Sequence, residues 1–284
     1  MRRFGLLLLA FLLIGAPLAA QRGRTSPPAG TVEISYGAGE RQRLDFTPVV
    51  DREAPLVLFV HGGGWRRGDK RMAAHMAAHF HSRGYAFAAV NYRLVPDVTV
   101  AQQAEDVAAA LARAMREPGI DGRRILLIGH SAGAHLVALV GTDPAYLAAH
   151  RIPLSAIGGV VALDGAGYDV PRQMAEAGPL LRRLYTNAFG DDPAAQRRVS
   201  PISHVAAPNA GRFLILHIAD RPDDSGAQSE ALGAALRSAG TPAEVASVEG
   251  THAQIFRDWG VPGHRATSLA DAFADAVFGS IERR

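Results

Sequence analysis

An apolar run, Ile125-Leu126-Leu127-Ile128, passes directly into Gly129-His130-Ser131-Ala132-Gly133 and then into the helix-forming run Ala134 to Val140. This order predicts a strand, a sharp turn and a helix. In such a turn the glycines leave the room that a side chain would fill, so the hydroxyl of Ser131 projects above the sheet edge and the amide of Ala132 points toward whatever the serine attacks. A glycine-rich chain can carry G-x-S-x-G by chance, so the rest of the chain has to support this interpretation.

Strand and helix patterns alternate along most of the chain. Five further apolar runs predict strands: Leu56 to Val60, Tyr85 to Val90, Val160 to Leu163, Phe213 to Leu216 and Val245 to Val248. Helical spacing of apolar residues predicts helices over about 72–82, 100–115, 228–239 and 269–281. With an antiparallel hairpin of 31–36 and 42–46, these elements predict an α/β fold with a mostly parallel central sheet of about eight strands and helices on both faces.

Composition indicates one large domain, which we expect to cover residues 31–284. The chain has 284 residues, of which 48% are hydrophobic, and no repeat or linker interrupts the later part. The formal charge is +3, but Arg2 and Arg3 contribute two of these charges and the other arginines are scattered. The sequence therefore predicts no nucleic-acid partner. It has no cysteine, so its stability uses no disulfide.

The N-terminal segment has the pattern of a signal peptide over residues 1–20. A basic start precedes the apolar run Phe4 to Ile14, Pro17 and the pair Ala19-Ala20. The apolar stretch is shorter than the roughly 20 residues that a membrane span needs, although Leu18 before the small pair leaves a retained anchor as the alternative. We expect an exported protein, periplasmic or secreted, with no stable span in the mature chain. Residues 21–30 are predicted to be a disordered lead-in.

The rhythm of strands and helices fails over about 169–205, where Pro, Arg and Gly are frequent. We expect an insertion that covers the site, because long connections of this kind are more often functional than plain loops. The alternative is a helix-containing connection with no role in substrate choice.

Reactive residues follow four of the predicted strands. In an open α/β sheet, ligands bind beyond the carboxyl ends of the strands, where this chain has His61-Gly62-Gly63-Gly64-Trp65, Ser131, Asp220 and His252. Ser, Asp and His in this chain order suit acyl transfer: His252 would take the proton of the serine, and Asp220 would orient the imidazole. Three successive glycines let backbone amides approach a negatively charged substrate oxygen.

These pieces resemble the α/β-hydrolase fold, in the esterase and lipase branch that includes hormone-sensitive-lipase-like and feruloyl-esterase-like carboxylesterases and kynurenine formamidase. The resemblance covers the chain from about Thr31 to its end. The matching motifs are His61 to Trp65, Asn91-Tyr92-Arg93-Leu94 with Pro96, Gly129 to Gly133, Ser200-Pro201-Ile202, and the late Asp and His positions.

The resemblance implies a role for each site residue. Ser131 is the nucleophile, Asp220 the acid and His252 the base. The oxyanion hole is formed by the amides of Gly63, Gly64 and Ala132, with Gly62 as the alternative to Gly64. No metal or cofactor is implied.

The acid is the least determined member of this site. The family usually has a glycine soon after the strand that carries the acid, whereas this chain reads His217-Ile218-Ala219-Asp220-Arg221-Pro222-Asp223-Asp224. Asp220 is the first choice, Asp223 or Asp224 the second, and Asp164, which follows the preceding strand, the third. Each of these could instead be a turn residue.

Other residues have two interpretations as well. Trp65 and Trp259 could line an acyl pocket or fill the core. His75 and His79 stand four apart on a helix, but no Glu lies between them, so we expect a solvated helix face rather than a metal site. His130 and His135 are expected to pack around the serine turn.

The sequence thus predicts a serine hydrolase that cleaves small-molecule carboxylic esters through an acyl-enzyme. An arylformamidase-like amidase is the nearest alternative, and a non-catalytic binding module on the same scaffold is the alternative of a different class.

Overall fold

One eight-stranded sheet organises the structure, a computed structural model that describes residues 26–50, 53–206, 208–219, 221 and 225–279. The strand order across the sheet is β1-β2-β4-β3-β5-β6-β7-β8. The strands are β1 (Val32–Ser35), β2 (Arg43–Thr47), β3 (Ala54–Val60), β4 (Ala86–Val90), β5 (Ile120–His130), β6 (Ile157–Leu163), β7 (Phe213–Ile218) and β8 (Ala243–Val248). The predicted signal peptide and residues 21–25 of the predicted lead-in lie outside the described residues.

The predicted mixture of strand directions is confirmed. β1 and β2 form the antiparallel hairpin, and β2 pairs with β4 in the antiparallel direction. All pairs from β4 through β3 to β8 are parallel. The carboxyl ends of six strands therefore meet at one edge of the sheet, where the candidate site residues were expected.

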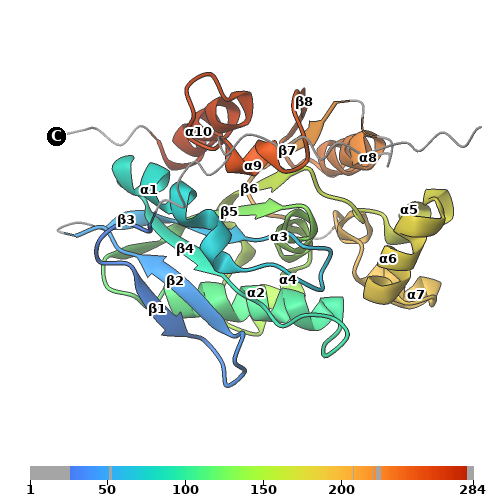
Figure 1. The fold of residues 1–284 in the computed structure, drawn as a ribbon, viewed down its shortest axis with the longest axis horizontal. Coiled ribbons are helices and arrows are strands. Elements are labelled where there is room, and N and C mark those ends of the chain that lie inside the picture. Colours follow the sequence, from blue (N-terminus) through green and yellow to red (C-terminus); the bar gives the residue numbers. More distant parts are fainter. Residues whose placement is uncertain (1–25, 51–52, 207, 220, 222–224, 280–284) are drawn as a thin grey trace, which may run out of the picture.

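Helices cover both faces of the sheet, as the alternating pattern predicts (Figure 1). One face packs against α2 (Val100–Ala114), α3 (Ala132–Thr142) and α8 (Ser225–Ser238), and the other packs against α1 (Ala74–Ser82), α9 (Gln254–Arg257) and α10 (Arg265–Phe278). A short helix, α4 (Pro144–Ala148), follows α3. Among the helices of the described ranges, none combines the length and apolar character needed to cross a membrane.

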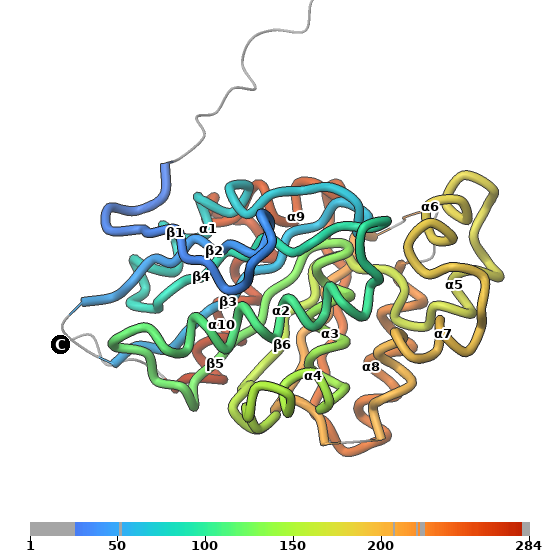
Figure 2. The backbone as a smooth tube through the Cα atoms, turned by 90° about the horizontal axis from the view of Figure 1, so that it is seen from below, coloured from blue at the N-terminus to red at the C-terminus, as the bar shows by residue number. Residues whose placement is uncertain are grey.

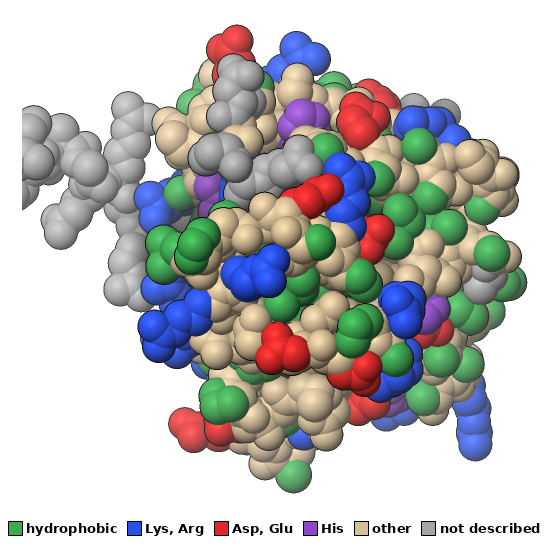
Figure 3. Space-filling model, turned by 90° about the vertical axis from the view of Figure 1, so that its right-hand side faces the viewer, with side chains coloured by type: hydrophobic (Ala, Val, Ile, Leu, Met, Phe, Trp, Pro, Cys, Tyr) green, Lys and Arg blue, Asp and Glu red, His purple; other side chains and the backbone are tan. Residues whose placement is uncertain are grey.

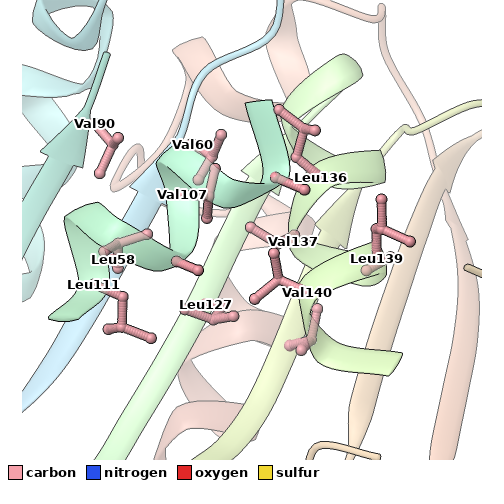
Figure 4. Packing of buried hydrophobic residues seen from close by; sticks show 14 of the residues in the cluster. Leu58, Val60, Val90, Val107, Leu111, Leu127, Leu136, Val137, Leu139 and Val140 are labelled. Atoms are coloured by element: carbon pink, nitrogen blue, oxygen red, sulfur yellow. The ribbon is translucent and has the colours of Figure 1, made fainter. Parts of the chain in front are cut away.

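The core consists of two layers because neighbouring residues of a strand point to opposite faces. In β3, Leu58 and Val60 face α2 and α3, whereas Phe59 belongs to the layer beneath α1 and α10. Figure 4 shows the first of these layers, where side chains of α2 and α3 interdigitate with those of β3 and β5. Each fully buried aliphatic side chain contributes roughly 1.5–3 kcal/mol. This packing holds β3 and β5, the two strands that carry the glycine loop and the serine, in fixed register.

The segment with the failed rhythm forms three helices, α5 (Val170–Glu176), α6 (Pro179–Phe189) and α7 (Pro193–Arg198). Each begins with a proline in its first turn, which suits a helix start because proline lacks an N–H and has a helical φ. The three helices lie together at one end of the sheet in both views (Figures 1 and 2). Figure 3 faces this end, where hydrophobic side chains lie scattered among charged ones.

Candidate active site

The predicted serine turn is present between β5 and α3. Ser131 has φ 57° and ψ −121°, which is a strained conformation for a residue with a side chain. The flanking glycines are required by contact: a Cβ on Gly129 would lie 2.2 Å from the carbonyl oxygen of Gly133, and one on Gly133 would lie 2.1 Å from that of Val60. The amide of Ser131 donates to the carbonyl of Leu163, at 2.8 Å, so β6 also supports the turn.

His252 lies beside the serine, as predicted. It follows β8 in the loop before α9, and its Nε2 lies 3.0 Å from Ser131 Oγ. This is hydrogen-bond distance, so the imidazole can accept the serine proton.

The neighbouring His130 supports the His252 loop. Its Nε2 lies 2.7 Å from the carbonyl oxygen of His252, and the two ring centroids are 4.6 Å apart. Burial, with the nearby His252 ring, lowers the pKa of His130 to about 3. The neutral ring therefore donates a hydrogen bond from Nε2. His130 packs around the turn, as the sequence predicts.

Among the described residues, Asp164 is the one whose carboxylate contacts the imidazole of His252. Its Oδ2 lies 2.5 Å from His252 Nδ1, and its Oδ1 accepts the amide of Ile218 at 3.0 Å. Its side chain is fully buried, and its backbone has a φ of 48°. Burial alone would raise the pKa of Asp164, but the hydrogen bonds from His252 and Ile218 and the charge of Arg221 lower it to about 2. Asp164 is therefore ionised at neutral pH.

This observation changes the order of the candidate acids. Asp220, Asp223 and Asp224 lie outside the described residues, so the first choice from the sequence stays a prediction. Asp164, the third choice, is the aspartate in contact with the imidazole. β6 and β7 are adjacent and parallel, so residues after either strand reach the same edge. Because both also precede His252 in the chain, residue order could not distinguish them.

The glycine loop after β3 lies against the serine. A Cβ on Gly62 would stand 2.8 Å from Ser131 Cβ, so only glycine fits. Gly63 and Gly64 have φ of 129° and 60°. In the part of the chain that the structure describes, no acceptor bonds the amides of these two residues, and Ala132, as the first residue of α3, has no acceptor within its helix. These are the amides that the resemblance assigns to the oxyanion hole.

Trp65 fills the core instead of lining an open pocket. The residue is only 2% exposed, and its ring lies 4.6 Å from that of Phe189 in α6, measured between centroids. Its Nε1 lies 3.4 Å from Nδ1 of His135. The prediction of Trp65 as a pocket residue is not supported by this position. His135 packs behind the turn as predicted, fully buried, with Nε2 2.8 Å from the carbonyl of Val199.

Leu184 borders the glycine loop, although no sequence pattern marks it as a site residue. This residue of α6 reaches the glycine loop, where its Cδ1 would lie 3.1 Å from a Cβ on Gly64. Leu180, one turn earlier on α6, is 84% exposed. The apolar spacing of Leu180 and Leu184 indicates a common helix face, but only the folded chain brings α6 to the loop.

The motif that begins at Asn91-Tyr92 packs against the start of the glycine loop. The hydroxyl of Tyr92 donates to the carbonyl of His61 at 3.0 Å, and the two rings stack with centroids 4.5 Å apart. Burial lowers the pKa of His61 to about 4, so its ring is neutral at pH 7. These contacts connect β3 and β4 at the start of the loop.

The histidine pair on α1 has separate partners. His75 Nε2 lies 2.7 Å from the carbonyl of Phe256, and His79 Nε2 lies 2.9 Å from Asp271 of α10. Both rings are partly buried, so the expectation of a solvated helix face is wrong: α9 and α10 pack against it.

Comparison with known families identifies the type of protein. The BD-FAE family model matches residues 45–236, about two thirds of the chain, which include the glycine loop, the serine turn and Asp164. The chain belongs to the BD-FAE family. The resemblance to α/β-hydrolase esterases is confirmed. The match ends before His252, which the structure nevertheless places at the serine.

Individual relatives agree with this assignment. Esterase LipQ of Mycobacterium tuberculosis is 32% identical over 230 residues, covering 75% of this chain and 54% of that protein. Kynurenine formamidase of Drosophila melanogaster is 34% identical over 137 residues, covering 46% and 45%. The chain thus spans about half the length of these relatives. A structure of Thermogutta terrifontis esterase 2, phosphonylated by sarin, has a TM-score of 0.74 at 22% identity and covers 90% of this chain and 98% of that one. The α/β-hydrolase fold is confirmed.

Proposed function

We propose that this BD-FAE family member is a serine hydrolase that cleaves small-molecule carboxylic esters through an acyl-enzyme. The observation that carries the proposal is the chain of contacts from Ser131 Oγ to His252 Nε2, at 3.0 Å, and from His252 Nδ1 to Asp164 Oδ2, at 2.5 Å. Esterase names among the relatives support the same reaction class.

In the first step, His252 Nε2 accepts the hydroxyl proton as Ser131 Oγ attacks the ester carbonyl. Asp164 accepts the Nδ1–H of His252, which leaves Nε2 unprotonated and available as the base. The imidazolium then gives its proton to the leaving alcohol. Water, activated by the same imidazole, releases the acid from Ser131.

The tetrahedral oxygen needs donors that are already in place. The amide of Ala132 and those of the glycine loop, at Gly63 with Gly64 or Gly62, are assigned to this role. Since helix α3 begins at Ala132, its N-terminal dipole adds to the stabilisation of negative charge. Removing one such donor costs about 100- to 1,000-fold in rate.

The test is turnover of a short p-nitrophenyl ester by the wild-type chain and by Ser131→Ala. The variant should lose turnover and labelling by a fluorophosphonate probe while keeping its circular dichroism and melting temperature. Ser229→Ala is a matched control, because Ser229 is a buried serine of α8 whose hydroxyl donates to the backbone carbonyl of Ser225 at 2.8 Å and not to Ser131, His252 or Asp164. Equal turnover by wild type and Ser131→Ala would refute the proposal, and wild-type protein that does not react with the probe would favour a binding module.

An amidase is the second candidate, supported by the partial match to kynurenine formamidase. The same serine, base and oxyanion donors serve an N-formyl aromatic amide, so the site chemistry does not separate the two substrates. The ratio of kcat/KM for an aryl ester to that for an N-formyl arylamine decides between them. A ratio below one would favour the amidase.

We further propose that the protein is exported, on the pattern of residues 1–20. Cell fractionation with N-terminal sequencing of the expressed chain tests this. A chain that keeps Met1 and stays in the cytoplasm would contradict it.

A further inference from the structure

Arg221 reaches the same carboxylate oxygen as the catalytic imidazole. Its Nη1 contacts Asp164 Oδ2, to which His252 Nδ1 also bonds, and Nη1 and Nδ1 themselves are in contact. The arginine comes from the connection between β7 and α8, whereas Asp164 follows β6 and His252 follows β8. Three neighbouring connections thus meet at one oxygen.

This contact differs from an ordinary surface ion pair. The Asp164 side chain is fully buried and that of Arg221 is 20% exposed, so water screens their interaction only weakly. An Nδ1–H that donates to Asp164 has no lone pair to offer the guanidinium. The approach of Arg221 to the ring is therefore a contact between a fixed positive charge and the group that becomes positive during catalysis.

We propose that Arg221 is a positioning residue of this hydrolase, which holds the Asp164 carboxylate toward His252 and disfavours the protonated form of the imidazole. The inference rests on the proposed function. A positive charge beside the ring opposes the imidazolium, and by sharing Oδ2 the guanidinium also weakens the support that Asp164 gives to that imidazolium. Removing the guanidinium takes away both effects.

The other described groups around the imidazole do not compensate for Arg221. From the β5 end, His130 faces the ring and its pKa of about 3 leaves it neutral. Just before α3, the group that faces the ring is the uncharged hydroxyl of Ser131. Among described residues that contact the ring, Asp164 is the negative charge and Arg221 the positive one. Asp220, Asp223 and Asp224 neighbour Arg221 in sequence and lie outside the described residues.

The test compares pH profiles of kcat/KM for Arg221→Gln and Arg221→Lys with wild type. Gln keeps a hydrogen-bond donor without charge, and Lys keeps the charge without the planar guanidinium. We expect the acid limb of Arg221→Gln to move to higher pH by about one unit, which is about tenfold lower kcat/KM at a pH one unit below the wild-type limb. Arg221→Lys should keep its acid limb within about 0.3 unit of wild type, because a nearby charge, rather than a particular shape, sets the effect.

Arg212→Gln is the matched control, since it removes the same charge from a partly exposed residue at the opposite end of β7. Its acid limb should coincide with that of wild type. Coincident limbs for Arg221→Gln and wild type would overturn the proposal, as would equal displacement by Arg212→Gln.

A second measurement separates this inference from the proposed function. The protonation midpoint of the His252 imidazole is followed by NMR, assigned through loss of its signal in His252→Gln. This titration needs no turnover, so it remains informative if no ester is cleaved. A higher midpoint in Arg221→Gln than in wild type supports the role of the charge, and an equal midpoint in a folded variant rejects it.

Discussion

Replacing Asp164 by Asn tests the assignment of the acid most directly. The change keeps the size of the side chain but turns the acceptor of the His252 Nδ1–H into a group that can donate instead. The imidazole can then take the tautomer with its proton on Nε2, which cannot accept the proton of Ser131. A loss of about 10⁴-fold in kcat accompanies this tautomer change in a serine protease triad, so we expect a loss of about 10³- to 10⁴-fold here.

The same variant has a calculable effect on stability. The pKa of Asp164 falls from an ordinary value of 3.8 to about 2 in the folded chain. At about 1.4 kcal/mol per pKa unit, the ionised carboxylate contributes about 2 kcal/mol at neutral pH. Because the folded pKa is the lower one, this contribution is present above about pH 4 and is lost as the pH falls toward about 2. The variant should therefore melt roughly 4–8 °C lower at pH 7.

The assay is steady-state turnover of a p-nitrophenyl ester, with Asp220→Asn as the matched variant and differential scanning calorimetry for stability. We expect Asp220→Asn to stay within about threefold of wild type, as for a change outside the triad. If Asp164→Asn kept near-normal kcat while Asp220→Asn lost it, the acid would be Asp220 and the reasoning from the observed contacts would be refuted.

Three further predictions concern the surroundings of the site. The buried histidines with a lowered pKa are His61, His130 and His135. Because these folded pKa values lie below 6.5, the three neutral rings contribute fully to the free energy of unfolding above about pH 6.5, and this free energy should fall by about 4 kcal/mol per pH unit as the pH drops toward 4. Urea titrations at several pH values measure this slope. Replacing His135 by Phe should reduce the slope by about a third, and an unchanged slope would show that the buried histidines do not cause it. Gly133→Ala should prevent stable folding, since its Cβ would lie 2.1 Å from the carbonyl oxygen of Val60, and a variant with wild-type melting temperature would show that the turn can relax. Leu184→Ala, which opens space over Gly64, should raise kcat/KM for esters with a bulky acyl group roughly tenfold relative to acetate, and a substrate panel with an unchanged order would argue that α6 does not border the substrate.

Local pattern determined much of this protein. Apolar runs of four to six residues favour strands covered on both faces, so the strands were predictable from the sequence, as were the helices α1, α2, α3, α8 and α10. The glycines of the serine turn and of the loop at Gly62 were also predictable, because the backbone there approaches its neighbours so closely that any side chain would clash. Ser131 and His252 were predictable for another reason: each follows the carboxyl end of a parallel strand, and these ends meet at the site.

Other features depended on which segments become neighbours. Trp65 is a large aromatic residue next to the glycine loop, as a pocket residue would be, but its ring is buried because α6 places Phe189 against it. Leu184 carries no signal of its own until the same helix reaches Gly64. Sequence order left several aspartates equivalent, because β6 and β7 end side by side. The carboxylate of Asp164 is directed to His252 by its backbone, which has a φ of 48°, and by the amide of Ile218 in the neighbouring strand. A contact between strands of this kind depends on the tertiary structure, and no local sequence pattern encodes it.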